Sequence, residues 1–253
     1  MNTANRKKPL LITIALSHYC EKARWAMDYL NLDYQEESHT PLFHRQYTSR
    51  YGGTTVPVLV TENKALTDSH DILEYLNDIS EDKKLYPENL QLCDRVKTLE
   101  KLFDEKLGVA TRVWGYYYAM EEPRKVALAW SIKAPLTEKI KTIVSSHNIP
   151  RLLKVSYRIN LQTKNTALKN IKEVFATVNN ELNSGEQYLV GDRLSAADIT
   201  FAALASPILH PPNHPIYSSE LSKMSDERLA VIKELRSTPA GKLAMHIYRE
   251  HRR

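Results

Sequence analysis

The sequence is poor in cysteine and glycine, and it contains no long apolar run. Its 253 residues include two cysteines and seven glycines. Two cysteines are too few for the disulfide scaffold of a small secreted protein, so we expect a reducing, cytoplasmic location. No apolar stretch reaches the ~18 residues that a helix needs to span a bilayer. The low glycine content and the scarcity of strand-like alternation favour a mostly helical fold.

The charge balance is mildly basic, with a formal net charge of +5 at pH 7. Part of this charge lies at the two ends, in NRKK (5–8) and REHRR (249–253). Basic ends alone are a weak indication of nucleic-acid or membrane binding, so we expect solvated ends and no nucleic-acid partner. The scattered histidines lack the spacing of metal ligands, and we expect no metal site.

The first 80 residues predict a compact α/β unit. A short apolar run rich in β-branched residues comes first, and apolar residues then recur at helical spacing. Strand-like and helix-like segments alternate up to an amphipathic helix that has Ser69 near its N-cap. The predicted elements are strands at 10–16, 32–38, 56–60 and 65–67, helices at 19–30 and 69–79, and an irregular or short helical segment at 41–51.

The remainder of the chain predicts helices almost throughout. Residues 81–90 are charged, include a proline and lack a helical stripe, which is typical of a linker. We therefore expect domains at 1–80 and 91–253. Within the second, Ser195 and Asp198 precede an apolar run with the spacing of a capping box.

The polar tetrad Ser17-His18-Tyr19-Cys20 follows the first predicted strand, where a helix is expected to begin. Free backbone N–H groups and the positive end of the helix dipole favour an anion at such a position. The tetrad therefore indicates a binding site for a negatively charged group, although a simple helix cap is the competing interpretation of Ser17.

Four segments in this order resemble the cytosolic glutathione transferase superfamily, and the end of the chain resembles a bacterial branch of it. The resemblance implies a thioredoxin-like N-terminal domain followed by an all-α C-terminal domain. It also implies glutathione as co-substrate, a homodimer and a role in detoxification. The four segments are SHYCEKARW (17–25), TVPVL (55–59), LTDSHDILEYL (66–76) and YLVGDRLSAADIT (188–200).

The resemblance assigns glutathione-binding roles to five positions. The Ser17 hydroxyl would stabilise the glutathione thiolate, which is the reactive form of the thiol. Val56 would pair its backbone with the cysteinyl unit, before a cis bond to Pro57. Asp68 and Ser69 would hold the γ-glutamyl ammonium and carboxylate.

The sequence departs from its relatives at Thr55, where many have a lysine that helps to hold the glycyl carboxylate. His39, His44 or Arg45 could substitute, and the sequence does not choose among them.

The acceptor side of the expected site is less defined. Trp114, Tyr117 and Tyr118 could line an apolar pocket for the electrophile, or they could pack in the helical core. The segment 133–161 is longer than a helix-to-helix turn needs. It could cover the cleft, support dimerisation, meet an acidic surface or form a solvated insertion.

We therefore predict a glutathione transferase that adds the thiolate to a small apolar electrophile. Two alternatives remain open. A glutathione-dependent thiol reductase would use Cys20, whose pKa could be lowered by the helix start and by Lys22 and Arg24 nearby. A non-catalytic module would use the same fold to bind ligands or partners.

Overall fold

The computed structural model describes residues 8–182, 186–216 and 221–252, so Arg6, Lys7 and Arg253 of the basic ends lie outside the described residues. Its sheet has four strands in the order β2-β1-β3-β4. The β1–β2 pair is parallel, whereas the β1–β3 and β3–β4 pairs are antiparallel. The strands are β1 (Leu10–Thr13), β2 (Gln35–Ser38), β3 (Val58–Val60) and β4 (Ala65–Leu66).

The helices of the N-terminal domain lie close to their predicted positions. They are α1 (His18–Tyr29), the short α2 (His44–Thr48) with a 3₁₀ turn at Ser49–Tyr51, and α3 (Ser69–Ile79). Ser69 lies next to the N-cap of α3, as predicted; the N-cap itself is Asp68, which accepts a hydrogen bond from His70 N at 2.7 Å. Ser69 is the first helical residue and is buried.

After Leu90 the described part of the chain consists of helices joined by loops and contains no strand, as predicted for the C-terminal domain. One π-helical segment, Phe103–Gly108, connects the first two long helices. The α-helices are α4 (Leu90–Leu102), α5 (Val109–Ala119), α6 (Pro123–Trp130), α7 (Leu136–Val144), α8 (Ile149–Tyr157), α9 (Leu161–Glu181), α10 (Ala196–Leu209), α11 (Asp226–Ser237) and α12 (Pro239–His251). None of these described helices combines the length and the apolar character that a bilayer crossing requires.

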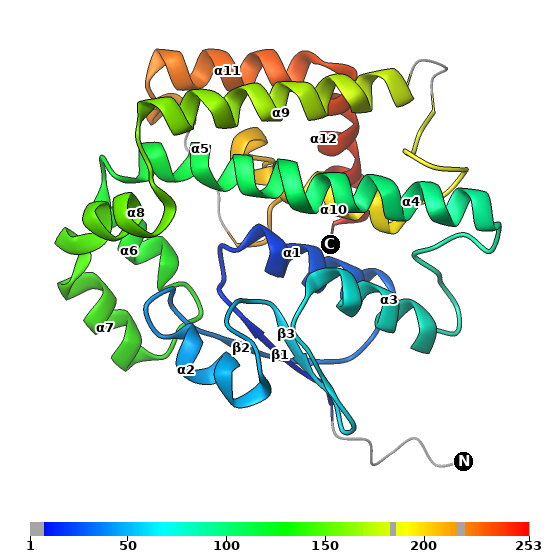
Figure 1. Cartoon of the computed structure of the whole chain (residues 1–253), viewed down its shortest axis with the longest axis horizontal. Coiled ribbons are helices and arrows are strands. Elements are labelled where there is room, and N and C mark those ends of the chain that lie inside the picture. Colours follow the sequence, from blue (N-terminus) through cyan, green and yellow to red (C-terminus); the bar gives the residue numbers. More distant parts are fainter. Residues whose placement is uncertain (1–7, 183–185, 217–220, 253) are drawn as a thin grey trace.

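Helix α1 lies between the strands and the long C-terminal helices (Figure 1). It packs on α3 on one side and on α10 on the other. Its apolar residues Ala23, Trp25 and Met27 are fully buried. Because α1 is enclosed by both domains, its first turn is held in place by the whole molecule.

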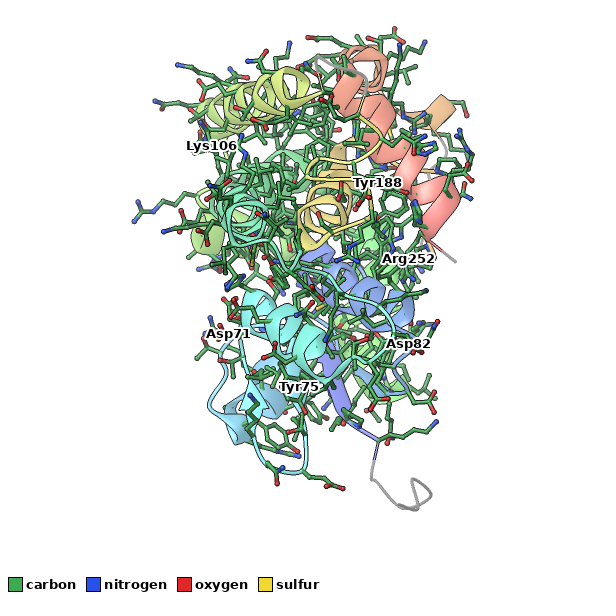
Figure 2. The ribbon with its side chains drawn as sticks, turned by 90° about the vertical axis from the view of Figure 1, so that its right-hand side faces the viewer. Asp71, Tyr75, Asp82, Lys106, Tyr188 and Arg252 are labelled. Atoms are coloured by element: carbon green, nitrogen blue, oxygen red, sulfur yellow. The ribbon has the colours of Figure 1, made fainter. Side chains whose placement is uncertain are left out.

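Two buried charged residues of α1, Glu21 and Lys22, are paired across the domain boundary. Lys22 Nζ lies 2.8 Å from Glu100 Oε1 and 2.7 Å from Asp104 Oδ2. Glu21 accepts a hydrogen bond from Arg252, which lies at the end of α12. Arg252 is labelled in Figure 2. Removing one partner of such a pair would leave a buried charge uncompensated, so these contacts specify how the two domains meet.

The predicted insertion at 133–161 belongs to a small helical unit with its own core. Trp130, Ile149 and Leu153 form part of that core. Glu138 of α7 connects the unit to the N-terminal domain, since it accepts from Thr40 N at 3.0 Å and contacts His39 Nδ1 at 2.8 Å. In Figure 1 helix α7 is the helix of this unit that lies next to α2. Residues 133–161 therefore contact the N-terminal domain, whereas the lining of the two interdomain cavities comes from other segments, and the predicted roles of this insertion stay predictions.

Candidate active site

Two cavities meet the first turn of α1. Ser17 and His18 line one of them, and the next residue, Tyr19, lines the other. The turn is therefore the element shared by both cavities. The N–H groups of a first helical turn have no intrahelical acceptor, so this turn also presents the partial positive charge expected from the sequence.

The cavity that Tyr19 lines is called the first cavity below and has a volume of about 280 Å³. It brings together four of the five predicted glutathione residues. The Val56–Pro57 peptide bond is cis, as predicted. Ser69 contributes the start of α3, and Asp68 lies beside it as the N-cap. The lining residues are Tyr19, Thr55, Val56, Pro57, Thr67, Asp68, Ser69, Asp104 and Glu105.

Three carboxylates face this first cavity, from Asp68, Asp104 and Glu105. Only Asp68 was expected from the sequence, because the other two come from the π-helical segment. Burial raises the pKa of Asp104, although the Lys22 ammonium acts in the opposite direction. The acidic edge suits an ammonium group such as that of a γ-glutamyl unit.

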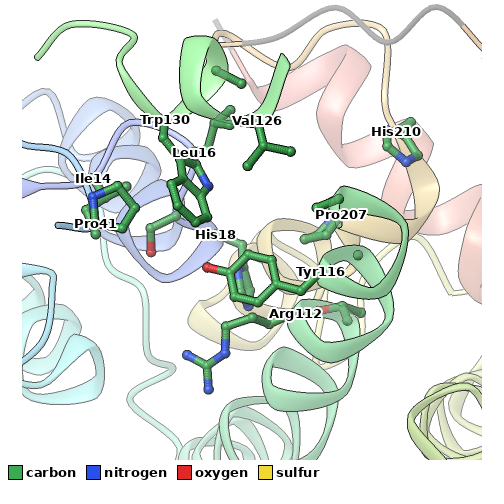
Figure 3. A pocket seen from close by; sticks show the side chains of 15 residues that line it. Ile14, Leu16, His18, Pro41, Arg112, Tyr116, Val126, Trp130, Pro207 and His210 are labelled. Atoms are coloured by element: carbon green, nitrogen blue, oxygen red, sulfur yellow. The ribbon is translucent and has the colours of Figure 1, made fainter. Parts of the chain in front are cut away.

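The second cavity, of about 310 Å³, is mainly apolar and lies beside Ser17. Its walls come from the end of β1, from α5 and from α6 (Figure 3). The Tyr116 and Trp130 rings meet there nearly edge to face, with centroids 6.1 Å apart. The lining residues are Ile14, Leu16, Ser17, His18, Pro41, Thr111, Arg112, Gly115, Tyr116, Ala119, Val126, Ala129, Trp130, Pro207 and His210.

Ser17 is the N-cap of α1 and is partly exposed to the second cavity. Its hydroxyl oxygen accepts a long hydrogen bond, 3.4 Å, from Cys20 N. Because the hydroxyl accepts in this contact, its hydrogen stays available for donation to a ligand atom. The cap role and the ligand role that the sequence left as alternatives are therefore compatible.

Cys20 is enclosed by protein, with no exposed surface. Burial raises the pKa of its thiol, although the Arg24 guanidinium and the Ser17 hydroxyl act in the opposite direction. Arg24 is itself engaged by Glu36 and Glu21, and Lys22 is paired with α4, so neither cation produces the lowered pKa considered from the sequence.

The π-helical segment holds His18 and Tyr19. His18 Nε2 lies 2.9 Å from Gly108 O, and the Tyr19 hydroxyl donates to Asp104 O at 2.6 Å. A methyl group at Gly108 would collide with the Tyr19 ring, so only glycine permits this close approach. Burial, with a contribution from Arg112, lowers the pKa of His18 to about 3, and burial raises the pKa of Tyr19 to about 12. Both side chains therefore stay neutral at pH 7.

The structure corrects the predicted electrophile pocket. Trp114 and Tyr118 pack in the main core, with exposed fractions of 0% and 8%, and Tyr117 lines a separate surface cavity near Met120. Residues at positions i, i+3, i+4 and i+7 share one helix face, and the face of α5 toward the cavity consists of Arg112, Gly115, Tyr116 and Ala119. The three predicted residues lie on other faces of α5, and the face that meets the cavity depends on how α5 packs against α9 and α10.

The candidates for the glycyl carboxylate do not line the first cavity. Both ring nitrogens of His39 are engaged by Glu138 and Glu37. His44 contacts Pro41 O through Nδ1 at 3.0 Å, and Arg45 is exposed on α2. Thr55 does line the cavity.

Arg112 was not singled out from the sequence, yet it lines the apolar cavity. Its Nε is buried without a hydrogen-bond partner in the described part of the chain. Its guanidinium carbon lies 5.3 Å from the centroid of the Tyr157 ring. No sequence signal distinguishes Arg112 from a solvated helical arginine, because its partners are distant in sequence.

The chain matches two family models in succession. Residues 11–84 match the glutathione S-transferase N-terminal domain, and residues 144–212 match the C-terminal domain of the same family. Together with the fold, these matches show that the chain belongs to the glutathione transferase superfamily. No curated protein matches the sequence significantly.

Solved structures share the fold at low identity. The β-etherase LigF from Sphingobium sp. strain SYK-6 is 18% identical, with a TM-score of 0.62 over 95% of this chain and 99% of that one. Glutathione transferase GSTFuA3 from Phanerochaete chrysosporium is 16% identical, with a TM-score of 0.63 over 98% and 99%. A glutathione S-transferase from Methylobacterium radiotolerans in complex with glutathione sulfonate is 16% identical, with a TM-score of 0.56 over 94% and 95%.

Proposed function

We propose that this protein is a glutathione transferase that conjugates glutathione to a small aromatic or apolar electrophile. The single observation that carries the proposal is the shared first turn of α1. One cavity holds the residues expected to bind glutathione, the other is apolar, and consecutive residues of this turn line both.

In the proposed reaction, glutathione occupies the cavity at Val56, Asp68 and Ser69, and its sulfur extends to Ser17. The thiol proton leaves to solvent, and the Ser17 hydroxyl donates to the thiolate. One charge-assisted hydrogen bond together with the helix dipole supplies about 2–3 kcal/mol, or roughly two pKa units. The sulfur then forms a bond to the electrophilic carbon while the bond from that carbon to its leaving group breaks.

The environment of each neighbouring side chain supports Ser17 over its competitors. The Tyr19 hydroxyl already donates to Asp104 O, and the pKa of Tyr19 is raised by burial. The Cys20 thiol is fully buried with a raised pKa, which argues against its use as a nucleophile in a thiol reductase. A non-catalytic binding module would show glutathione binding without turnover.

The test compares Ser17→Ala with Cys20→Ala in two assays. We expect Ser17→Ala to lower conjugation of 1-chloro-2,4-dinitrobenzene about tenfold or more, since one lost transition-state hydrogen bond costs at least ~1.4 kcal/mol. Cys20→Ala should leave this rate within a few-fold. The second assay follows reduction of a glutathione mixed disulfide.

Loss of activity in Cys20→Ala with normal activity in Ser17→Ala would reverse the two roles and place the protein with the thiol-transfer enzymes.

The homodimer implied by the resemblance and the cytoplasmic location stay predictions. Light scattering of the purified protein tests the homodimer, because the mass of a single chain at micromolar concentration would contradict it.

A further inference from the structure

The apolar cavity carries one formal charge at neutral pH among its described lining residues. The lining that the described residues form includes no aspartate, glutamate or lysine. Burial lowers the pKa of both His18 and His210 to about 3, so these rings are neutral. Arg112 is therefore the cation of an otherwise uncharged pocket.

This guanidinium has no protein counter-ion among the described residues. In the described part of the chain no ion pair joins Arg112 to a carboxylate and its buried Nε has no hydrogen-bond partner, while its guanidinium lies over the Tyr157 ring. Arg112 is half-buried. A partly desolvated charge without a partner costs free energy, and a guanidinium presents donors in a fork that matches a carboxylate. The arrangement suits a ligand that brings the missing negative charge.

The position of Arg112 favours the electrophile over glutathione as the source of that charge. Arg112 lines the cavity that contains Tyr116 and Trp130, and it is not part of the lining of the cavity with Val56 and Ser69. Figure 3 shows Arg112 and Tyr116 extending from α5 toward the side of the pocket where His18 lies. An aromatic ring against Tyr116 and Trp130 would place a substituent within reach of the guanidinium.

We propose that the electrophile accepted by this pocket is an aromatic compound that bears an acidic group, and that Arg112 binds this group as a specificity-determining residue. The inference rests on the proposed function. The reaction is unchanged: sulfur bonds to the ring carbon, the leaving halide departs, and the acid group stays ionised and bound throughout.

The test uses a matched pair of substrates, 4-chloro-3-nitrobenzoate and 4-chloro-3-nitrobenzamide, which differ in charge at the position opposite the chloride. We expect Arg112→Gln to lower kcat/KM for the benzoate about tenfold or more, the range for a lost hydrogen bond to a charged group. The benzamide rate should change little, and Arg112→Lys should recover part of the benzoate rate. Arg124→Gln, an exposed arginine on α6, is the control and should affect neither substrate.

Equal loss for both substrates in Arg112→Gln would overturn the proposal, because it would mean that Arg112 acts on the glutathione sulfur. No loss for either substrate would also overturn it. If the parent protein conjugates neither compound, the proposed function fails, and calorimetry without glutathione still tests the inference. The benzoate should then bind more tightly than the benzamide, and Arg112→Gln should remove that difference; equal binding by the parent would contradict the inference.

Discussion

At the scale of single residues, the chemistry of the candidate site depends on which groups remain free to act. The Ser17 hydroxyl accepts a long contact from Cys20 N and retains its hydrogen for a ligand. Tyr19 and His18 are committed to backbone carbonyls of the π-helical segment. Cys20 is closed off by burial. Ser17 is therefore the residue of the tetrad that lines a cavity and keeps a hydroxyl hydrogen for a ligand.

A prediction at this scale concerns Ser69, the first residue of α3. Its hydroxyl and backbone N–H lie at a helix N-terminus, where a carboxylate is favoured. We expect Ser69→Ala to weaken glutathione binding by about 1–2 kcal/mol, measured by titration calorimetry. Ser225→Ala, at the exposed N-cap of α11, is the matched control and should leave binding unchanged. Equal affinity of Ser69→Ala and the parent would remove Ser69 from the site.

At the scale of elements, helix α10 supports α1 and hence the site. Asp198 in its first turn is fully buried and accepts from Leu189 N at 2.8 Å, from Ser195 N at 2.9 Å and from Ser195 Oγ at 2.7 Å. The predicted capping box is thus confirmed, and it extends to the loop before the helix. Burial raises the pKa of Asp198 to about 6, although the hydrogen bonds act in the opposite direction.

The corresponding prediction is that Asp198→Ala lowers the free energy of unfolding by about 2–6 kcal/mol. Two buried N–H groups lose their acceptor, and each unsatisfied group costs about 1–3 kcal/mol. Chemical denaturation measures the change. Asp226→Ala, which removes an exposed carboxylate from the first turn of α11, should cost less than about 1 kcal/mol. A loss of similar size in both variants would show that the buried network contributes nothing beyond ordinary helix-end electrostatics.

At the scale of the whole molecule, the two domains meet across buried charges and neutral histidines. Lys22 pairs with Glu100 and Asp104, and Arg252 with Glu21. Burial lowers the pKa of His18 and His210 to about 3 and that of His214 to about 4. Protonation of these buried histidines at low pH therefore destabilises the interior of the molecule, in addition to any effect on surface groups.

We predict that the free energy of unfolding falls as the pH drops from 7 to 5. The folded-state pKa of each of the three histidines lies below the unfolded value, so the unfolded chain binds protons first. Each contributes about 2 kcal/mol to the loss at pH 5. Asp198 contributes to the pH dependence of the free energy of unfolding with the opposite sign. Its folded pKa is raised, so its ionisation above pH 4 destabilises the folded state.

A pair of variants isolates the histidine contribution, because the effect of Asp198 is common to both. His18→Gln should show a weaker pH dependence than the parent, and His147→Gln, at an exposed position, should match the parent. Guanidinium unfolding at pH 7 and pH 5 provides the measurement. An unchanged pH dependence in His18→Gln would contradict a neutral, buried His18.

The sequence by itself determined the features that a few adjacent residues encode. The order of elements, the cis Val56–Pro57 bond, the Ser195–Asp198 box and the clustering of Val56, Asp68 and Ser69 around one cavity follow from local signals and from the family resemblance. Helical periodicity and capping act within one or two turns, so they can be recognised without knowledge of the packing.

Only the tertiary structure decided which side chains face the second cavity. The sequence predicted Trp114, Tyr117 and Tyr118, and the packing of α5 turned Arg112 and Tyr116 there instead. It also decided that Cys20 is buried and that Lys22 is paired with Glu100, far along the chain. The physical reason is that burial, and with it the pKa of a group, depends on neighbours that folding brings together from distant parts of the sequence.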